Sequence, residues 1–277
     1  MGTVLVTGAS RGIGRATVKK LAESGWDVIA GVRRKEDGEP LAGPHVTPVV
    51  LDITDDAQLA ALQESLPKRL DALVANAGIV VEGPVEGLGL DDLRRQLDVN
   101  VVGQVALAQA VLPRLRESKG RIVFISSVSG RLSTPMTGAY NASKFALEGI
   151  ADALRIELRP WGIKVIVVQP TSTDTDMWSG ALDKIDTMEA SLGDEQRRLY
   201  AGHLEGIRKT TRMIQKRTAP VEQVVETIER ALNAERPKAR YPVGALAKAQ
   251  LAMGGATPTR VLDAVLARAT GVPRKPG

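Results

Sequence analysis

The stretch 3-TVLVTGASRGIG-14 decides the fold, because a short apolar run leads straight into a turn that contains three glycines. Glycine lets the backbone turn sharply and approach a ligand, and free N–H groups at the start of a following helix favour a phosphate. The spacing is GxxxGxG and not the GxGxxG of the general dinucleotide fingerprint. Such glycines can also form no more than a tight turn, but a place after the first strand of an α/β array favours a dinucleotide site.

Short apolar runs alternate with longer helical patterns along the chain, and most runs are continuously apolar, as expected for parallel strands covered on both faces. We expect strands at 3–7, 27–32, 47–51, 71–77, 121–126, 163–169 and 240–243, and helices at 12–24, 55–65, 90–117, 139–159 and 221–234. Thr54 and Asp91 stand where N-caps belong, and Gly25 and Gly162 follow helices as stop signals. Repeated βα units predict an α/β fold: a Rossmann-like, doubly wound parallel sheet of about seven strands with helices on both faces.

The rhythm of strands and helices breaks after Pro170, and residues 171–220 are helical but irregular. Toward the end of the chain, 254-GGATP-258 indicates a turn. With 277 residues and no sign of a second core, we expect a single domain over 1–277, in which 254–277 form a C-terminal helix and a frayed tail.

Composition excludes several kinds of protein. The chain has no cysteine and only two histidines, His45 and His203, so we expect neither disulfides nor a metal site. The net charge is +5, but the basic segments lack the interleaved aromatic residues that stack on bases, so we expect no nucleic-acid partner and rather a phosphorylated small molecule. No apolar run approaches membrane-spanning length and the first residues do not form a signal peptide, which predicts a soluble cytoplasmic protein.

Five motifs together resemble those of the short-chain dehydrogenase/reductase family, and they occur in the expected order over roughly the first two-thirds of the chain. They are 7-TGASRGIG-14, 76-NAG-78, Asn100, 126-SS-127 and 140-YNASK-144. The resemblance implies a Rossmann fold that binds NAD(H) or NADP(H), with an active site beyond the carboxyl ends of the strands. In the glycine-rich turn it implies cofactor contacts from Gly8, Ser10, Arg11, Gly12, Ile13 and Gly14.

The end of the second predicted strand indicates which nicotinamide cofactor is bound. An NAD enzyme places an acidic residue there for the ribose 2′-hydroxyl, but this chain has Val32 followed by Arg33 and Arg34. A carboxylate would repel a 2′-phosphate, whereas Arg33, together with Arg11, can bind it. The alternative is that Arg33 and Arg34 are ordinary surface charges. We expect NADP(H) to be preferred over NAD(H).

Further cofactor contacts follow from the resemblance. It places Asp52 and Ile53 at the adenine edge and Asn76, Ala77 and Gly78 beside the ribose on the adenine side. After the sixth strand the family usually has a Pro-Gly turn that leads to a threonine, whereas this chain reads 169-QPTSTDTDM-177. We expect Pro170, Thr171, Thr173 and Thr175 to lie at the nicotinamide, with Thr171 in place of the glycine and Thr173 in place of an aliphatic residue.

The resemblance assigns catalysis to Asn100, Ser127, Tyr140 and Lys144. Tyr140 and Lys144 are four residues apart, so their side chains project from one helix face, one turn apart. Tyr140 would act as general acid in carbonyl reduction and general base in alcohol oxidation, with its pKa lowered by Lys144. Lys144 would also bind the nicotinamide ribose, Ser127 would hold the substrate oxygen, and Asn100 would hold a water that links Lys144 to solvent. Each residue alone has an ordinary structural explanation, such as a cap, a packing group or a surface charge.

Residues 176–218 are expected to form a lid over the substrate. Its leucines, methionines and Trp178 favour a medium-to-large, apolar ketone, aldehyde or secondary alcohol. The alternative is an anionic substrate bound by basic residues of the same lid, which are Arg197, Arg198, Arg208, Lys209 and Arg212. Helical spacing can place the apolar residues inward and these charges in water.

Other functions are less consistent with the chain. The nucleophile motif GxSxG of serine hydrolases and the P-loop motif GxxxxGK[ST] are absent from the sequence. The remaining alternative is a non-enzymatic NADP(H)-binding regulator or scaffold on the same fold, which would be expected to lack part of the catalytic set. By analogy with the family we expect a homodimer or homotetramer that packs the helices at 90–117 and 139–159.

Overall fold

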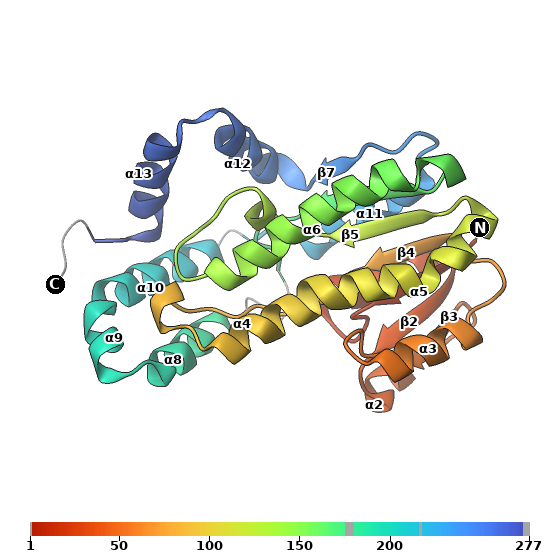
Figure 1. Cartoon of the computed structure of the whole chain (residues 1–277), viewed down its shortest axis with the longest axis horizontal. Coiled ribbons are helices and arrows are strands. Elements are labelled where there is room, and N and C mark those ends of the chain that lie inside the picture. The colour runs from red at the N-terminus through yellow and green to blue at the C-terminus, as the bar shows by residue number, and fades with distance from the viewer. Residues whose placement is uncertain (1, 175–179, 216–217, 274–277) are drawn as a thin grey trace.

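The computed structural model describes residues 2–174, 180–215 and 218–273. In these residues a seven-stranded parallel sheet has the order β3-β2-β1-β4-β5-β6-β7 (Figure 1). The strands are β1 (Thr3–Thr7), β2 (Asp27–Val32), β3 (Val46–Val50), β4 (Ala72–Ala75), β5 (Arg121–Ile125), β6 (Lys164–Gln169) and β7 (Arg240–Pro242). The strand order reverses between β1 and β4, which is where ligands bind in doubly wound sheets.

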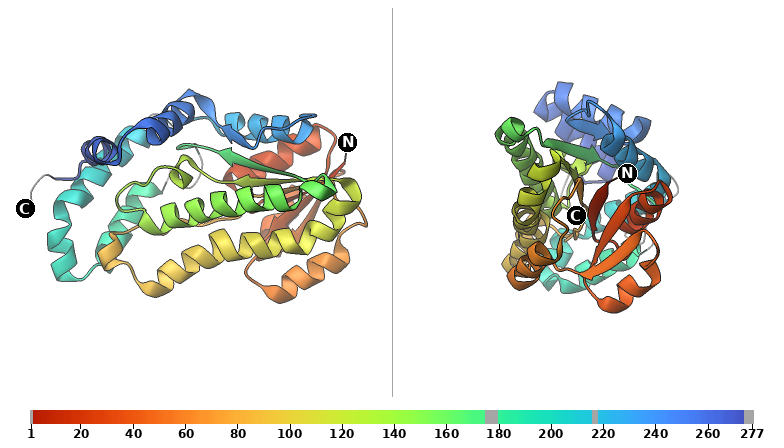
Figure 2. Two further views of the ribbon diagram at one scale, coloured as in Figure 1. Left: turned by 45° about the horizontal axis from the view of Figure 1, so that its top comes forward. Right: turned by 90° about the vertical axis from the view of Figure 1, so that its right-hand side faces the viewer.

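Helices cover both faces of the sheet (Figure 2). One face carries α3 (Asp56–Ser65), α5 (Gly103–Ser118) and α6 (Gly138–Glu157), packed on strand residues such as Leu5 and Leu73. The other carries α1 (Gly12–Glu23) and α11 (Val221–Asn233), packed on Val4, Val6 and Val74. Successive residues of β1 thus face opposite cores, which explains why its sequence is continuously apolar and confirms the predicted fold class.

The remaining helices lie mostly at the carboxyl ends of the strands. They are α2 (Lys35–Gly38), α4 (Leu90–Leu97), α8 (Ala181–Ser191), α9 (Asp194–Leu199), α10 (Ala201–Gln215), α12 (Gly244–Ala256) and α13 (Thr259–Thr270). Figure 1 shows α8, α9 and α10 beyond the sheet at one end of the molecule, with α13 against α10. No helix among the described residues is long and apolar enough to cross a membrane.

Two predicted helix starts were wrong. The N-cap of α3 is Asp55, whose carboxylate accepts hydrogen bonds from the amides of Ala57 and Gln58, while Thr54 instead bonds to Asp52. Carboxylates and hydroxyls both cap helices, and the residue that meets the first turn is decided by backbone geometry. Asp91 lies inside the first turn of α4, where its negative charge still favours the helix start.

The predicted helix at 90–117 is divided. Between α4 and α5, residues Asp98–Val102 form one turn of π-helix that contains Asn100. Near the end of the chain, the predicted turn at 254–258 is shorter than expected because α12 continues to Ala256. A Cβ on Gly254 would lie 2.5 Å from the side chain of Leu132, so this glycine serves close packing inside a helix rather than a turn.

Candidate active site

The four expected catalytic residues come from three elements at the carboxyl ends of the strands. Ser127 lies two residues after the end of β5, Tyr140 and Lys144 lie in the first two turns of α6, and Asn100 lies in the π-helical turn between α4 and α5. Extended backbone at Ser127 continues the line of β5 before a short 3₁₀ turn. The fold therefore brings Ser127, Tyr140 and Lys144 to one edge of the sheet.

Lys144 is buried, with 6% of its surface exposed. Its Nζ donates a hydrogen bond of 2.8 Å to the carbonyl oxygen of Ile125, at the end of β5. Burial lowers the pKa of Lys144 from 10.5 to about 8, and the negative charge of Glu148 opposes part of this fall. Lys144 therefore exchanges a proton near neutral pH.

Tyr140 is partly buried, and the Nζ of Lys144 lies 5.7 Å from the centre of its ring. Burial raises the pKa of the Tyr140 phenol above 10, and a hydrogen bond with Ser127 offsets part of the rise. The expected lowering of this pKa by Lys144 is thus not found in the free protein. The cost of removing a phenolate from water exceeds the benefit of a lysine whose ammonium is already bound to Ile125.

The hydroxyl of Ser127 holds the turn in which it lies. Its Oγ accepts a hydrogen bond of 3.1 Å from the amide of Ser129 and donates a long one of 3.4 Å to the carbonyl of Pro170. Since the amide of Val128 also donates to Pro170, at 2.9 Å, the loops after β5 and β6 are tied together at this point.

Asn100 uses its side chain to fix the chain after β4. Its Oδ1 accepts from the amide of Ile79 at 2.9 Å, and its Nδ2 donates to the Ile79 carbonyl at 3.0 Å and to Ser143 Oγ at 3.1 Å. Its contact with α6 is the hydrogen bond to Ser143, and Lys144 is not its partner. The water that Asn100 was expected to hold stays a prediction. The sequence did not single out Gln96, which accepts from the amide of Val81 at 2.6 Å.

A second polar group was also missed by sequence reasoning. Glu148, one turn beyond Lys144 on α6, is only 3% exposed. Its Oε2 pairs with Nε of Arg240 at 2.8 Å, and its Oε1 accepts from Gln169 at 2.9 Å. Arg240 also pairs with Asp152 at 2.7 Å. An acid four residues after Lys144, on the same face of a predicted helix, was the signal that could have revealed this network.

The glycine-rich turn has the geometry of a phosphate cradle. Gly8 and Gly12 have positive φ angles of 66° and 53°, which only glycine adopts without strain. A Cβ on Gly14 would lie 2.1 Å from the carbonyl oxygen of Gly8, so the helix can approach the turn only without a side chain there. Helix α1 begins after Arg11 with no side-chain cap and no acidic residue in its first turn. Its first N–H groups and its dipole can therefore bind an anion.

The chain after β4 supports this turn. Asn76 donates from Nδ2 to the carbonyl of Thr7 at 2.9 Å, and the amides of Asn76 and Ala77 both bond to the Thr7 hydroxyl at 3.2 Å. Ser10 and Ile13 are partly buried in the turn, and Gly78 lies so close to Asn100 that a Cβ there would be 3.3 Å from its Oδ1. The residues expected around the pyrophosphate are thus collected at the switch between β1 and β4.

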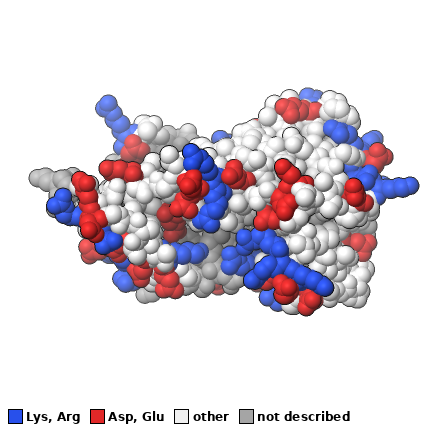
Figure 3. All heavy atoms as spheres, turned by 60° about the horizontal axis from the view of Figure 1, so that its bottom comes forward, with Lys and Arg blue, Asp and Glu red and all other residues white. Residues whose placement is uncertain are grey.

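Basic residues also gather next to the turn. The pKa of the Asp37 carboxyl is lowered, mainly by a hydrogen bond from Arg34. The positive charges of Arg34, Arg33 and Arg11 lower it further. Arg34 is bidentate to Asp37 at 2.9 and 3.0 Å. Arg11 and Arg33 have no ion pair within the described residues. In the space-filling view, basic side chains gather beside a hollow and acidic ones border them (Figure 3). Sequence reasoning missed Asp37, which binds Arg34, one of the three arginines expected at the cofactor.

Most residues expected to contact the adenine and the nicotinamide are buried or hydrogen-bonded within the protein. Ile53 is buried, and Asp52 accepts hydrogen bonds from the amide and hydroxyl of Thr54. The Thr171 hydroxyl donates to Gln250 of α12 at 3.1 Å, and Thr173 is buried and donates to the Thr171 carbonyl at 3.0 Å. Thr175 lies outside the described residues, as do Met177 and Trp178 of the predicted lid.

The described part of the predicted lid packs on the loop before α6. Ile185, Met188, Leu192 and Leu204 form an apolar cluster with Met136. Among the lid arginines, Arg208 is bound to Asp186 and Glu189. Under the lid is a cavity of about 140 Å³ whose walls come from the chain after β4, the loop before α6, α8, α10 and the end of α13. Thr270 and Val272 contribute to it, although the sequence indicated a frayed tail there.

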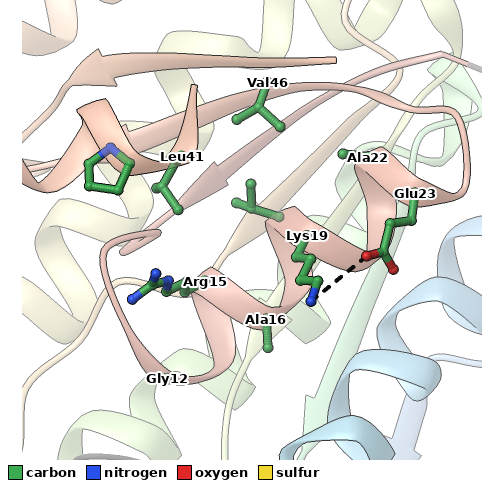
Figure 4. A pocket seen from close by; sticks show the side chains of 10 residues that line it. Gly12, Arg15, Ala16, Lys19, Ala22, Glu23, Leu41 and Val46 are labelled. Carbon is green, nitrogen blue, oxygen red and sulfur yellow. Dashed lines mark ion pairs between the residues drawn. The ribbon is translucent and has the colours of Figure 1, made fainter. Parts of the chain in front are cut away.

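A larger cavity of about 500 Å³ lies between α1 and β3 (Figure 4). It is lined by Ala16, Leu41 and Val46, among others, and Lys19 and Glu23 form an ion pair of 4.0 Å at its edge. It exists because the connection from β2 to β3 holds only the four-residue α2 and one 3₁₀ turn, which leave this face thinly covered. None of the four expected catalytic residues lines it, so it is not the catalytic pocket.

Comparisons with known proteins agree with this geometry. The sequence model of a family described as short chain dehydrogenase matches residues 2–186. A 3-amino-tetrahydro-pyrrolizinone reductase of Xenorhabdus hominickii is 36% identical, over 89% of this chain and 88% of its own. An NADPH-dependent 3-dehydrocapnine reductase of Ornithobacterium rhinotracheale is 34% identical, over 94% of each chain. The crystal structure of a short chain dehydrogenase from Burkholderia cenocepacia J2315 in complex with NADP has a TM-score of 0.76 and 28% identity, and covers 95% of this chain and 96% of that one.

Proposed function

Since the chain belongs to the short-chain dehydrogenase family of oxidoreductases, we propose that it is an NADP(H)-dependent enzyme that interconverts a carbonyl compound and its alcohol. The observation that carries the proposal is the grouping of Ser127, Tyr140 and Lys144 at the carboxyl ends of the strands, beside a glycine turn that fits a dinucleotide phosphate. A relative named as NADPH-dependent and a neighbouring structure solved with NADP support the choice of cofactor.

Residues of this chain can be assigned to each part of the cofactor. The N-terminus of α1 and the glycine turn would hold the pyrophosphate, and Arg33 with Arg11 would hold the 2′-phosphate, since neither is engaged with an acid as Arg34 is. Asp52 and Ile53 would border the adenine, and Lys144 would bind the nicotinamide ribose. When bound, the nicotinamide supplies a hydride to the carbonyl carbon in reduction and accepts one in oxidation.

The proton is handled by Tyr140. Because burial raises its pKa, the phenol keeps its proton at neutral pH and can donate it from Oη to the carbonyl oxygen as the C–H bond forms. The carbonyl thus gains one hydride and one proton and becomes an alcohol. Ser127 would hold the same oxygen through its Oγ. Tyr140 then needs a new proton, and Lys144, with a pKa of about 8, can pass one on near neutral pH.

The raised phenol pKa favours reduction over oxidation in this account, since an acid is already in place and a base is not. For the substrate we propose a predominantly apolar ketone or aldehyde. The described lid residues that face Met136 are apolar, and Arg208 is paired with two acids, so it is not free to bind an anionic substrate.

We also propose that the protein forms a homodimer or homotetramer through α5 and α6. Val102, Phe145 and Ile156, which lie at the start of α5 and along α6, are 59%, 43% and 69% exposed in the single chain. Large apolar side chains that are exposed in the single chain are candidates for burial in an interface. Sedimentation of the wild type and of Phe145→Glu should show an oligomer that the substitution weakens; a wild-type monomer would contradict this proposal.

The experiment that tests the enzyme function follows NADPH absorbance with a series of ketones and aldehydes of graded size and polarity. We expect carbonyl-dependent oxidation of NADPH, fastest with compounds that have a large apolar body and no carboxylate. If the protein binds NADPH but none of the carbonyl compounds supports its oxidation, the protein would instead be a regulator or scaffold. That outcome is disfavoured by the presence of all four catalytic residues.

A further inference from the structure

Two residues that line the cavity under the predicted lid each carry a buried polar atom with no hydrogen-bond partner. The atoms are Oε2 of Glu82, in the chain after β4, and Nδ1 of His203, on α10. The two atoms are not hydrogen-bonded to each other. A buried polar atom without a partner costs free energy, and a bound ligand can supply the partner.

Four other hydroxyls of the cavity are already hydrogen-bonded. The hydroxyls of Thr134 and Thr137 lie 2.8 Å apart and bond to each other. Those of Thr210 and Thr270 donate to carbonyls of their own helices, at 2.9 and 2.7 Å. Apart from Thr211, the remaining walls are apolar, with Met136, Pro135, Ile185, Ile207 and Val272 among them. Glu82 and His203 are therefore the two lining residues with a buried polar atom left unpartnered, in a mostly apolar space.

The position of Glu82 is fixed by its neighbours. The amide of Val81 donates to Gln96 at 2.6 Å, and the amide of Gly83 donates to the carbonyl of Met136 at 2.7 Å. Gly83 is also paired with Thr137, which lies three residues before Tyr140 at the start of α6. The carboxylate is thus held at the wall of the cavity next to the turn that carries the expected catalytic phenol.

A cationic ligand would offset the cost that burial places on a charged Glu82. Burial raises the pKa of its carboxyl, and the positive charge of Lys184 opposes the rise only in part. A cationic ligand would restore the charged form, and a hydrogen bond between two charged groups is roughly twice as strong as one between neutral groups. A carboxylated ligand would be repelled by the same residue.

We infer that Glu82 and His203 recognise an ammonium group on the substrate, so that the enzyme acts on an amino ketone, or on the matching amino alcohol, with an apolar body. The inference rests on the proposed function and narrows its substrate class. A cavity of about 140 Å³ is close in size to one of ~150 Å³ that holds a benzene molecule, so it fits the end of a substrate that carries the amine.

Three matched ketones test this inference by turnover with NADPH: one without a substituent, one with a primary amine and one with a hydroxyl at the same carbon. We expect wild-type kcat/KM to be roughly tenfold or more higher for the amino ketone, as one charge-assisted contact allows. Glu82→Gln keeps the shape of the side chain and should remove the preference. Glu205→Gln removes the same charge from the exposed face of α10 and should leave the preference unchanged.

Several outcomes of this assay overturn the inference. They are equal kcat/KM for the three ketones in the wild type, a preference for the hydroxy ketone, and an amino preference that survives in Glu82→Gln. In each of these cases the wild type still reduces ketones, so the proposed function stands while the substrate class fails.

A binding measurement tests the site without any turnover. Calorimetric titration of the NADPH-loaded protein with hexylamine and with hexanol should show tighter binding of the amine by roughly tenfold. Glu82→Gln and Glu82→Leu should both lose this difference while keeping the wild-type melting temperature within a few degrees. Equal affinity for amine and alcohol in the wild type would overturn the inference. Amine binding that depends on Glu82, in a protein that reduces no ketone, would support the site and contradict the proposed function.

Discussion

Replacing Lys144 with methionine should stabilise the free protein at pH 7 while it removes activity. Lys144 is buried, and its pKa falls from 10.5 to about 8. At about 1.4 kcal/mol per pKa unit, keeping this cation in the folded state costs about 3 kcal/mol below pH 8. Methionine has a similar shape and no charge, but it loses the hydrogen bond to Ile125, which contributes about 1 kcal/mol. The net gain at pH 7 should be about 2 kcal/mol.

The lowered pKa of Lys144 also determines how stability changes with pH. Between about pH 8 and 10.5 the unfolded chain still holds the Lys144 proton that the folded chain has lost, so the free energy of unfolding rises with pH. From pH 7 to 9.5 this contribution amounts to about 2 kcal/mol in the wild type, and it should be absent from Lys144→Met. The raised pKa of Tyr140 acts in the opposite direction only near and above pH 10.

Urea unfolding of both proteins at pH 7 and 9.5 measures the difference, because other groups titrate equally in the two. Lys164→Met serves as the control, since Lys164 is exposed on β6 and its replacement should not alter the pH dependence. If Lys144→Met were less stable than the wild type at pH 7 and showed the same rise with pH, Lys144 would not be a buried cation.

Three other substitutions test the cofactor cradle. Arg33→Ala should weaken NADPH binding by roughly 10- to 100-fold and leave NADH almost unchanged in a fluorescence titration, as the loss of one charged phosphate contact implies; a wild type that binds both cofactors equally would refute the NADP preference. Asp37→Asn should tighten NADPH binding several-fold by freeing the guanidinium that it holds, and weaker binding would show that it orients that group. Gly14→Ala should lower the free energy of unfolding by about 1–3 kcal/mol or more, since its Cβ would lie 2.1 Å from a backbone oxygen, whereas Gly149→Ala, in open space on α6, should raise it by about 0.5–1 kcal/mol.

The sheet could be predicted from sequence because its strands are buried on both faces. The bounds of β1 and β2 agree with the predicted strands at 3–7 and 27–32, where apolar runs end abruptly in glycines and charges. The interruption of the helix at Asn100 could not be predicted, because a π-helical turn changes hydrogen bonding without changing the apolar pattern. The N-cap at Asp55 was also missed, because threonine and aspartate are both favoured at N-caps and Thr54 is the neighbouring residue.

The residues assigned to the candidate site stay a prediction, and the direction in which their pKa values shift could not be predicted from sequence. The sequence placed Tyr140 and Lys144 on one helix face, yet burial, which acts on the pKa of both, depends on the packing of β5 and α6. Partners distant in the chain were also missed, such as Arg240 for Glu148. Glu82 offered a signal that was not used: a single acid in the apolar run 79-IVVEG-83 directly after a strand end.

The central claim is that Tyr140 protonates the substrate oxygen while the cofactor is held by other residues. The most direct measurement compares ketone-dependent NADPH oxidation by wild type and Tyr140→Phe, together with NADPH affinity by fluorescence titration. We predict a turnover at least about 100-fold lower in Tyr140→Phe, because general acid catalysis contributes roughly 10²–10⁴-fold, and an NADPH affinity within about twofold of wild type. Near-normal turnover in Tyr140→Phe would contradict the account and would assign the proton to another group.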